Sequence, residues 1–295
     1  MALILTFKQP PIDLSFPSEY DFEQINDLTY KLVKVNEETI TSINERAFYN
    51  CPSLESVIIP NSVNTIGNFA FYECESLESI VIPDSVNTIG NDAFSYCTSL
   101  KSIVIPDSIT NIGNSAFSSC TSLESITIPD SVNTIGEYAF SYCTSLKSIV
   151  IPDSVNTIGK YAFDFCESLE SVVIPDSVNT IGFRAFSYCT SLESVVVGLS
   201  VNIIDSGAFF ECSSLVSVVI PESIKNIGNY SFYFCKSLKS VVIPDSIISI
   251  QKDVFNYCTS LKIITINGLL TEYLKEYFET NYPEIDLEYN DYLLK

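Results

Sequence analysis

The stretch Ser99–Thr121, SLKSIVIPDSITNIGNSAFSSCT, decides the fold, because the chain repeats it with small changes every 23 residues. The same period separates the ten cysteines of the column Cys51–Cys258 and the ten phenylalanines of the column Phe48–Phe255. A fixed period between about 20 and 50 residues is typical of stacked repeats, in which each unit packs on its neighbours. The sequence therefore predicts a solenoid of ten coils over Ile40–Ile266.

The order of residue types within one coil predicts its local structure. Ser102–Ile105 is short and β-branched, which favours a strand, and Pro106 ends the strand because it has no N–H to donate. Asp107–Ser108 suits a turn in which short polar side chains bond nearby backbone N–H groups. Gly113 suits a tight bend with a positive φ. The spacing of apolar residues in Ala116–Cys120 predicts one turn of α or 3₁₀ helix.

The repeat pattern SL-x-S-[IV]-x-IPxSV-x-x-IG-x-x-AF-x-x-C resembles the BspA-type leucine-rich repeats, over about three quarters of the chain. The resemblance implies an α/β fold, a right-handed leucine-rich-repeat solenoid. Members of this family are largely surface proteins of bacteria and protists that take part in adhesion and protein binding, and others are intracellular. The family has no catalytic residues to transfer to this chain.

Both ends depart from the repeat, and caps that cover the exposed sheet edges are expected there. Ser18–Asp21 is predicted to begin a short helix, Thr29–Val35 to form a strand under the first coil, and Thr271–Asn281 to form an amphipathic helix. Edge protection is the simpler interpretation of both ends, and a tail that docks a partner is the alternative. The predicted parts are an N-terminal cap (1–38), the solenoid (39–267) and a C-terminal cap helix with an acidic tail (268–295).

Composition excludes several classes of function. The formal net charge of −21 disfavours nucleic acid and anionic membrane surfaces, since both bind clustered Lys and Arg. There is no run of 18 apolar residues, so no membrane insertion is expected. The chain has no histidine, which removes Ser-His-Asp and Cys-His catalysis, and its isolated glycines form no phosphate-binding loop. We expect a protein that is not an enzyme and has no cofactor.

The cysteine and aspartate columns have simple structural interpretations. One cysteine per coil without histidine disfavours zinc, and parallel side chains in a ladder fit disulfide geometry poorly, so buried free thiols are expected. The aspartates that follow the prolines are expected to cap turns, with a weakly shared calcium ion as the alternative. These aspartates are Asp84, Asp107, Asp130, Asp153 and Asp176.

An exposed face of the strands is the first candidate binding surface. If Ile103 and Ile105 point inward, Ser102 and Val104 point outward. The resulting valine column comprises Ile58, Val81, Val104, Thr127, Val150, Val173, Val196, Val219, Val242 and Thr265. A column of charged residues flanks it: Glu55, Glu78, Lys101, Glu124, Lys147, Glu170, Glu193, Lys239 and Lys262. A long apolar stripe favours protein contact, whereas the alternative is that β-branched residues simply suit strands.

Two further features are candidate sites. An aromatic stripe lies between the phenylalanine and cysteine columns, and either contacts protein or covers its own turns. It comprises Tyr96, Tyr142, Phe165, Tyr188, Phe234 and Tyr257. The second feature is a coil in which Gly198-Leu199 replaces Pro-Asp and Asp205 replaces the corner glycine. Leu199, Ile203, Phe183 and Arg184 are predicted to form a local patch there, because irregular loops on a rigid scaffold often carry specificity. Neutral drift is the alternative.

The favoured function is a non-enzymatic protein-interaction module for adhesion or recognition through the repeated face. The alternative is an intracellular scaffold within a larger assembly. The partner is expected to be a protein, and self-association is possible. A carbohydrate ligand stays an open alternative, although the chain lacks tryptophan and no particular site indicates such a ligand. The N-terminal residues show no signal peptide, which favours the cytoplasm, with the cell surface as the alternative that the family resemblance implies.

Overall fold

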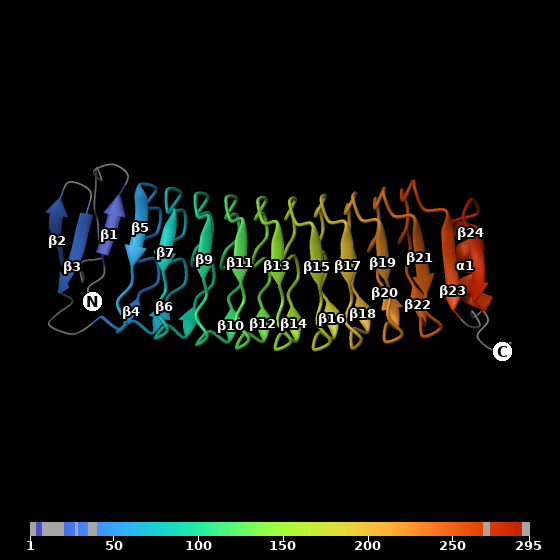
Figure 1. Cartoon of the computed structure of the whole chain (residues 1–295), viewed down its shortest axis with the longest axis horizontal. Coiled ribbons are helices and arrows are strands. Elements are labelled where there is room, and N and C mark those ends of the chain that lie inside the picture. Colours follow the sequence, from blue (N-terminus) through green and yellow to red (C-terminus); the bar gives the residue numbers. More distant parts are fainter. Residues whose placement is uncertain (1–3, 8–20, 27–28, 35–39, 268–271, 291–295) are drawn as a thin grey trace.

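The computed structural model describes residues 4–7, 21–26, 29–34, 40–267 and 272–290. Ten coils stack side by side along one axis, with the N-terminal strands at one end and the C-terminal helix and strand at the other (Figure 1). Successive coils pair in parallel at a register of 23 residues, so that Ser102, Ser125 and Ser148 lie side by side. The predicted solenoid of ten 23-residue coils is therefore confirmed.

Each coil contributes two short strands, one to each side of the stack. The first strands are β5 (Leu54–Ile58), β7 (Ser79–Val81), β9 (Ser102–Val104), β11 (Ser125–Thr127), β13 (Ser148–Val150), β15 (Ser171–Val173), β17 (Ser194–Val196), β19 (Ser217–Val219), β21 (Ser240–Ile243) and β23 (Ile263–Asn267). The second strands form one ten-stranded sheet: β4 (Ser42–Ile43), β6 (Thr65–Ile66), β8 (Thr88–Ile89), β10 (Asn111–Ile112), β12 (Thr134–Ile135), β14 (Thr157–Ile158), β16 (Thr180–Ile181), β18 (Ile203–Ile204), β20 (Asn226–Ile227) and β22 (Ser249–Ile250).

The segment after the second strand is not the helical turn that the sequence predicts. It is a run of turns in which two residues per coil, such as Asp92 and Tyr96, have positive φ values of 53° and 61°. Alternate N–H groups have different partners: that of Ala70 bonds three residues back to Gly67, whereas that of Phe71 bonds to the carbonyl of Ala93 in the next coil. A helix would direct every N–H along its own axis. The bonds between coils therefore replace helical winding.

The corner glycines also differ from expectation. None of them has a positive φ; the single glycine that does, among the described residues, is Gly207. At Gly113 a Cβ atom would lie only 2.8 Å from the carbonyl oxygen of Gly90 in the preceding coil. Glycine is therefore required there because two backbones approach closely.

The core is a set of columns that run the length of the stack. Phe48–Phe255 form a continuous stack of rings whose centroids lie 5.1–5.7 Å apart, with interplanar angles of 12° or less. Alanine, leucine, isoleucine or valine, and cysteine fill the remaining inward positions of each coil. The repeat period thus aligns like side chains, and each coil buries its apolar face against its neighbours.

The N-terminal strands extend the sheet of β5 and β7 with antiparallel pairs. They are β1 (Ile4–Phe7), β2 (Asp21–Asn26) and β3 (Thr29–Lys34), in the order β2-β3-β1-β5-β7. The predicted strand over 29–35 is present as β3, but β1 and not β3 pairs with the first coil. Of the helix expected to begin at Ser18, residues 18–20 lie outside the described residues, and Asp21 begins β2.

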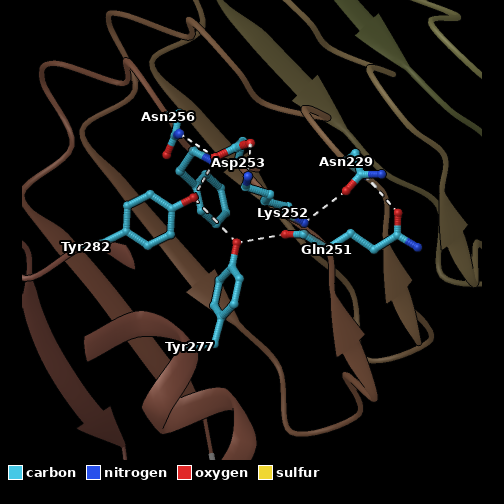
Figure 2. A network of polar contacts seen from close by, with 8 residues as sticks. Asn229, Gln251, Lys252, Asp253, Asn256, Tyr277 and Tyr282 are labelled. Atoms are coloured by element: carbon cyan, nitrogen blue, oxygen red, sulfur yellow. Dashed lines mark hydrogen bonds and ion pairs between the residues drawn. The ribbon is translucent and has the colours of Figure 1, made fainter. Parts of the chain in front are cut away.

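At the C-terminal end, helix α1 (Glu272–Asn281) occupies the predicted segment, and β24 (Asp286–Asn290) pairs in parallel with β23. The acidic segment is therefore an edge strand. Figure 2 shows how the cap is attached to the last coil: the Tyr277 hydroxyl donates to the carbonyl of Gln251 at 2.8 Å. The Tyr282 hydroxyl accepts the N–H of Phe255 at 3.0 Å.

Candidate protein-recognition face

The valine column lies on the exposed face of the first strands. In each of the three-residue strands from β7 to β19, the central residue is buried and the two outer residues are exposed. The six valines from Val81 to Val219 are 56–74% exposed, while Ile58 and Val242 are 38% and 37% exposed. Parallel pairing sets these side chains in one row at strand spacing, about 4.8 Å from coil to coil. The result is a long, flat β-branched surface.

The charged column beside the valines is close to neutral. It holds five glutamates and four lysines, a net charge of −1, in a chain of net charge −21. The Lys101 ammonium lies 3.3 Å from the Glu78 carboxylate, and Lys147 lies at the same distance from Glu124. These pairs are exposed, so each stabilises the fold by less than about 1 kcal/mol. Their main consequence is a face with little net charge.

The aromatic stripe belongs to the turn runs and not to the sheet. Phe165 stacks between Tyr142 and Tyr188, with ring centroids 4.6 Å and 4.2 Å away. All six residues of the stripe have positive φ values, and Tyr96 and Tyr142 are 45% exposed. Stacked rings at this spacing cover the backbone of the turns beneath them, and the exposed edges remain available for contact.

In the coil where Gly198-Leu199 replaces Pro-Asp, only some of the residues predicted to form a patch lie close together. The guanidinium of Arg184 lies 4.9 Å from the centroid of the Phe210 ring and 5.8 Å from that of Phe183. Ile203 lies in β18 beside Thr180. Leu199 is 72% exposed and lines neither of the two grooves that meet at Phe183; its N–H bonds to Asp176 Oδ1 at 2.6 Å.

Two grooves meet at Phe183. One, of about 480 Å³, is lined by residues of β14 and β16 and of the corners that follow them, and by Asp205. The other, of about 300 Å³, is lined by Arg184, Gly207, Phe210 and their neighbours. Lys160 and Thr180 of the larger groove were not among the predicted site residues. The sequence does hold a signal for this groove. Most other coils have asparagine, or another residue with an acceptor atom, at the position that Lys160 occupies.

The aspartates after the prolines do not make the predicted turn bonds, and Asp176 Oδ1 instead accepts the N–H of Leu199 in the next coil. The turn is instead fixed by the serine that follows, since Ser85 Oγ donates to the carbonyl of Val63 at 2.6 Å and Ser131 Oγ donates likewise to Ile109. Throughout the described ranges, no group of three or more His, Cys, Asp or Glu residues has the geometry of a metal site.

A family model for the BspA type leucine rich repeat region matches residues 18–145 and 179–288, in six copies. The chain belongs to the BspA-type leucine-rich repeat family. Leucine-rich-repeat solenoids of this family are generally not enzymes, and they are protein-interaction modules. No helix in the described part of the chain is long and apolar enough to span a membrane.

Two solved structures of leucine-rich-repeat proteins are similar in fold to this chain. A leucine-rich repeat protein from Eubacterium ventriosum is 28% identical, with a TM-score of 0.59; the alignment covers 74% of this chain and 62% of that one. The leucine rich repeat protein of T. pallidum is 27% identical, with a TM-score of 0.51 and coverage of 80% and 92%. The sequence matches none of the curated proteins with which it was compared.

Proposed function

We propose that this chain is a non-enzymatic protein-recognition module that binds its partner through the valine column. The observation that carries the proposal is the unbroken row of exposed β-branched side chains from Val81 to Val219. Large contiguous apolar patches on a soluble domain are typical of interaction sites. The row is also built on strands rather than on loops, so its side chains are held in place before a partner arrives.

The charge distribution supports a protein partner at this face. The flanking Glu and Lys side chains leave the face nearly neutral, whereas the remaining surface carries most of the net charge of −21. A partner that approaches the valine column therefore meets less charge repulsion than elsewhere on the molecule. Short side chains such as Ser102 and Val104 also lose little conformational entropy on contact. A flat protein surface with apolar and hydroxyl groups fits this face.

The finer proposal is adhesion or recognition at a cell surface, in line with the family. An intracellular scaffold is the second candidate. Fractionation of source cells with an antibody against the chain distinguishes the two, because adhesion requires the protein in the surface fraction and a scaffold requires it inside the cell.

The binding surface is tested by three substitutions in alternate coils, Val104→Glu, Val150→Glu and Val196→Glu. The matched control carries Thr88→Glu, Asn111→Glu and Ile248→Glu, which add the same charge at exposed positions on the side of the second strands. Both variants are expected to fold, since substitutions at exposed positions cost about 0.5 kcal/mol each or less. Affinity capture followed by mass spectrometry measures partner binding, and light scattering measures self-association.

The proposal predicts that the valine variant loses a partner that the wild type and the control retain. Loss of a dimer in the valine variant alone would identify a second copy of the chain as the occupant. Equal binding by all three proteins contradicts the proposal.

A further inference from the structure

A ladder of side-chain oxygens runs along the corner that follows the second strands. Asn68 Oδ1 accepts the N–H of Asn91 at 2.8 Å, and Asn91 Oδ1 accepts the N–H of Asn114 at 2.9 Å. Asn114 Oδ1 accepts the N–H of Glu137 at 2.9 Å. Figure 2 shows the same bond near the C-terminal end, from the N–H of Lys252 to Asn229. In these four bonds the acceptor is an amide oxygen, whereas the Ser206 N–H of the same column bonds to the Asp205 carboxylate.

Two consecutive coils, at Lys160 and Phe183, lack such a bond within the described residues, as does Asn68 at the start of the ladder. The Lys160 side chain has no acceptor atom, and the Glu137 carboxylate lies 3.9 Å from the Lys160 ammonium instead of reaching the backbone. The N–H groups of Lys160 and Phe183 consequently have no hydrogen-bond acceptor within the part of the chain that the structure describes. They stand one coil apart, at about 4.8 Å.

Both residues line the same open groove of about 480 Å³, which is within the size range of small-molecule sites. Other lining residues bear hydroxyl, amide or carboxylate groups: Glu137, Asn156, Thr157, Asn179, Thr180 and Asp205. Phe183 contributes the only aromatic ring of this lining, in a column that is otherwise polar from Glu45 to Lys252. The Tyr161 ring packs edge-on against Phe183 at 5.2 Å and fixes its position.

The chemistry of this lining selects a neutral, polyhydroxylated ligand. Glu137 and Asp205 outnumber the single ammonium of Lys160, and the whole chain is acidic, so an anion is disfavoured. Carboxylate and amide groups accept and donate hydrogen bonds to hydroxyls. The Phe183 ring offers a flat apolar surface that suits the C–H face of a pyranose ring. An amide oxygen of the ligand can accept the Phe183 N–H as the asparagine oxygens accept the N–H groups of the ladder.

We propose that this groove binds an N-acetylated hexosamine, with the acetamido oxygen on the N–H group of Phe183, in the place that an asparagine side-chain oxygen takes in the ladder. The sugar ring then lies against the Phe183 side chain, and its hydroxyls bond to the carboxylate and amide groups of the groove. The site lies beside β14 and β16, so it is independent of the valine column. If this proposal fails, the proposed function of the valine column is therefore not affected.

The test is an NMR titration of the ¹⁵N-labelled full chain with N-acetylglucosamine. The amide signals of Lys160 and Phe183 should shift saturably, with a dissociation constant on the order of 1 mM for a ligand of this size. Glucose lacks the acetamido group and should bind about tenfold more weakly, because the Phe183 N–H then has no acceptor from the ligand.

Two variants separate this site from non-specific sugar contact. Lys160→Asn supplies the missing ladder acceptor, as Asn91 does for Asn114, and should lower the affinity for N-acetylglucosamine about tenfold or more. It keeps the fold, since asparagine already occupies this column in four other coils. Phe183→Ala should lower the affinity by removing the stacking surface. Lys101→Asn, on the opposite strands, is the control and should bind as the wild type does.

Several results would overturn the proposal. They are the absence of a saturable shift at Lys160 and Phe183, equal binding of glucose, unchanged affinity in Lys160→Asn, or tighter binding of acetate or sulfate to the same amides. The last result would mark the groove as an anion site.

Discussion

The thiol of Cys97 donates a hydrogen bond to the carbonyl oxygen of Phe71 in the preceding coil, with the sulfur 3.2 Å from the oxygen. The same bond recurs for each of the nine cysteines from Cys74 to Cys258, at 3.1–3.3 Å. Cysteine is small enough for the column between the rings, and it still offers a weak donor to a buried carbonyl. The column therefore links neighbouring coils without disulfides, and all ten cysteines are free.

The thiols should be unreactive in the folded protein. Burial raises the pKa of Cys120 to about 12, so almost no thiolate forms near neutral pH. Cys51 is only half-buried, although burial raises its pKa to about 11. Titration with a thiol reagent should modify Cys51 slowly and the other nine only after unfolding, as peptide mass spectrometry would show. Rapid modification of several cysteines in the native state would contradict this account.

Stability should fall as the pH rises through the range in which Asp164 ionises. Its side chain is 6% exposed, and its Oδ1 has no hydrogen-bond partner within the described residues. Burial raises the pKa of Asp164 from 3.8 to about 6, although Ser187 and Arg184 beside it act in the opposite direction. The stabilising contribution of the neutral form is complete below about pH 4. This contribution is lost as the pH rises through 6, which lowers the free energy of unfolding by up to about 3 kcal/mol.

Asp164→Ser tests this dependence, because serine occupies the same column at Ser141 and Ser187. We expect the variant to be more stable than the wild type at pH 7.5 and nearly equal to it at pH 4. The difference between the two urea-unfolding free energies isolates Asp164 from the other carboxylates. A difference in unfolding free energy that does not change with pH would show that Asp164 has no role in the pH dependence of stability.

The stacked rings of the aromatic stripe should stabilise the turns that they cover. Phe165→Ala removes both stacking contacts, to Tyr142 and to Tyr188, and is expected to cost about 1–3 kcal/mol. A double-mutant cycle with Tyr188→Ala should give a coupling energy of about 0.5–1.5 kcal/mol. A coupling near zero would mean that these rings are free for another role.

The repeat pattern predicts that restoring the consensus by Gly198→Pro, Leu199→Asp and Asp205→Gly stabilises the protein modestly, because proline lowers the entropy of the unfolded chain. The structure reverses that prediction, since a Cβ atom at Gly198 would lie 2.4 Å from the carbonyl oxygen of Pro175. We expect Gly198→Pro alone to lower the free energy of unfolding by about 1–3 kcal/mol. Leu199→Ser, at an exposed position next to it, is the control and should change stability by about 0.5 kcal/mol or less. A Gly198→Pro variant more stable than the wild type would contradict the structure.

The inward and outward columns could be predicted from the sequence because the 23-residue period and the alternation within Ser102–Ile105 define them together. The run of turns after the second strand of each coil could not be predicted from the sequence. Its positive φ values fall on residues such as Tyr138 and Arg184, which have no intrinsic preference for them, and they are imposed by hydrogen bonds to the next coil. The groove at Phe183 likewise depends on a ladder between coils, which no single repeat reveals. The acidic C-terminal segment was predicted as a tail because its pairing with β23 depends on an edge that exists only in the assembled stack.

Site-specific photo-crosslinking tests the recognition face most directly. A benzophenone side chain replaces Val150 in one protein, Thr88 in a second and Tyr142 in a third, and each is irradiated with native extract. The account predicts that Val150 gives a specific crosslinked protein band, which excess unlabelled wild type removes, while Thr88 and Tyr142 give none. Specific crosslinks from Thr88 or Tyr142 but not from Val150 would contradict it, because the partner would then bind another side of the solenoid.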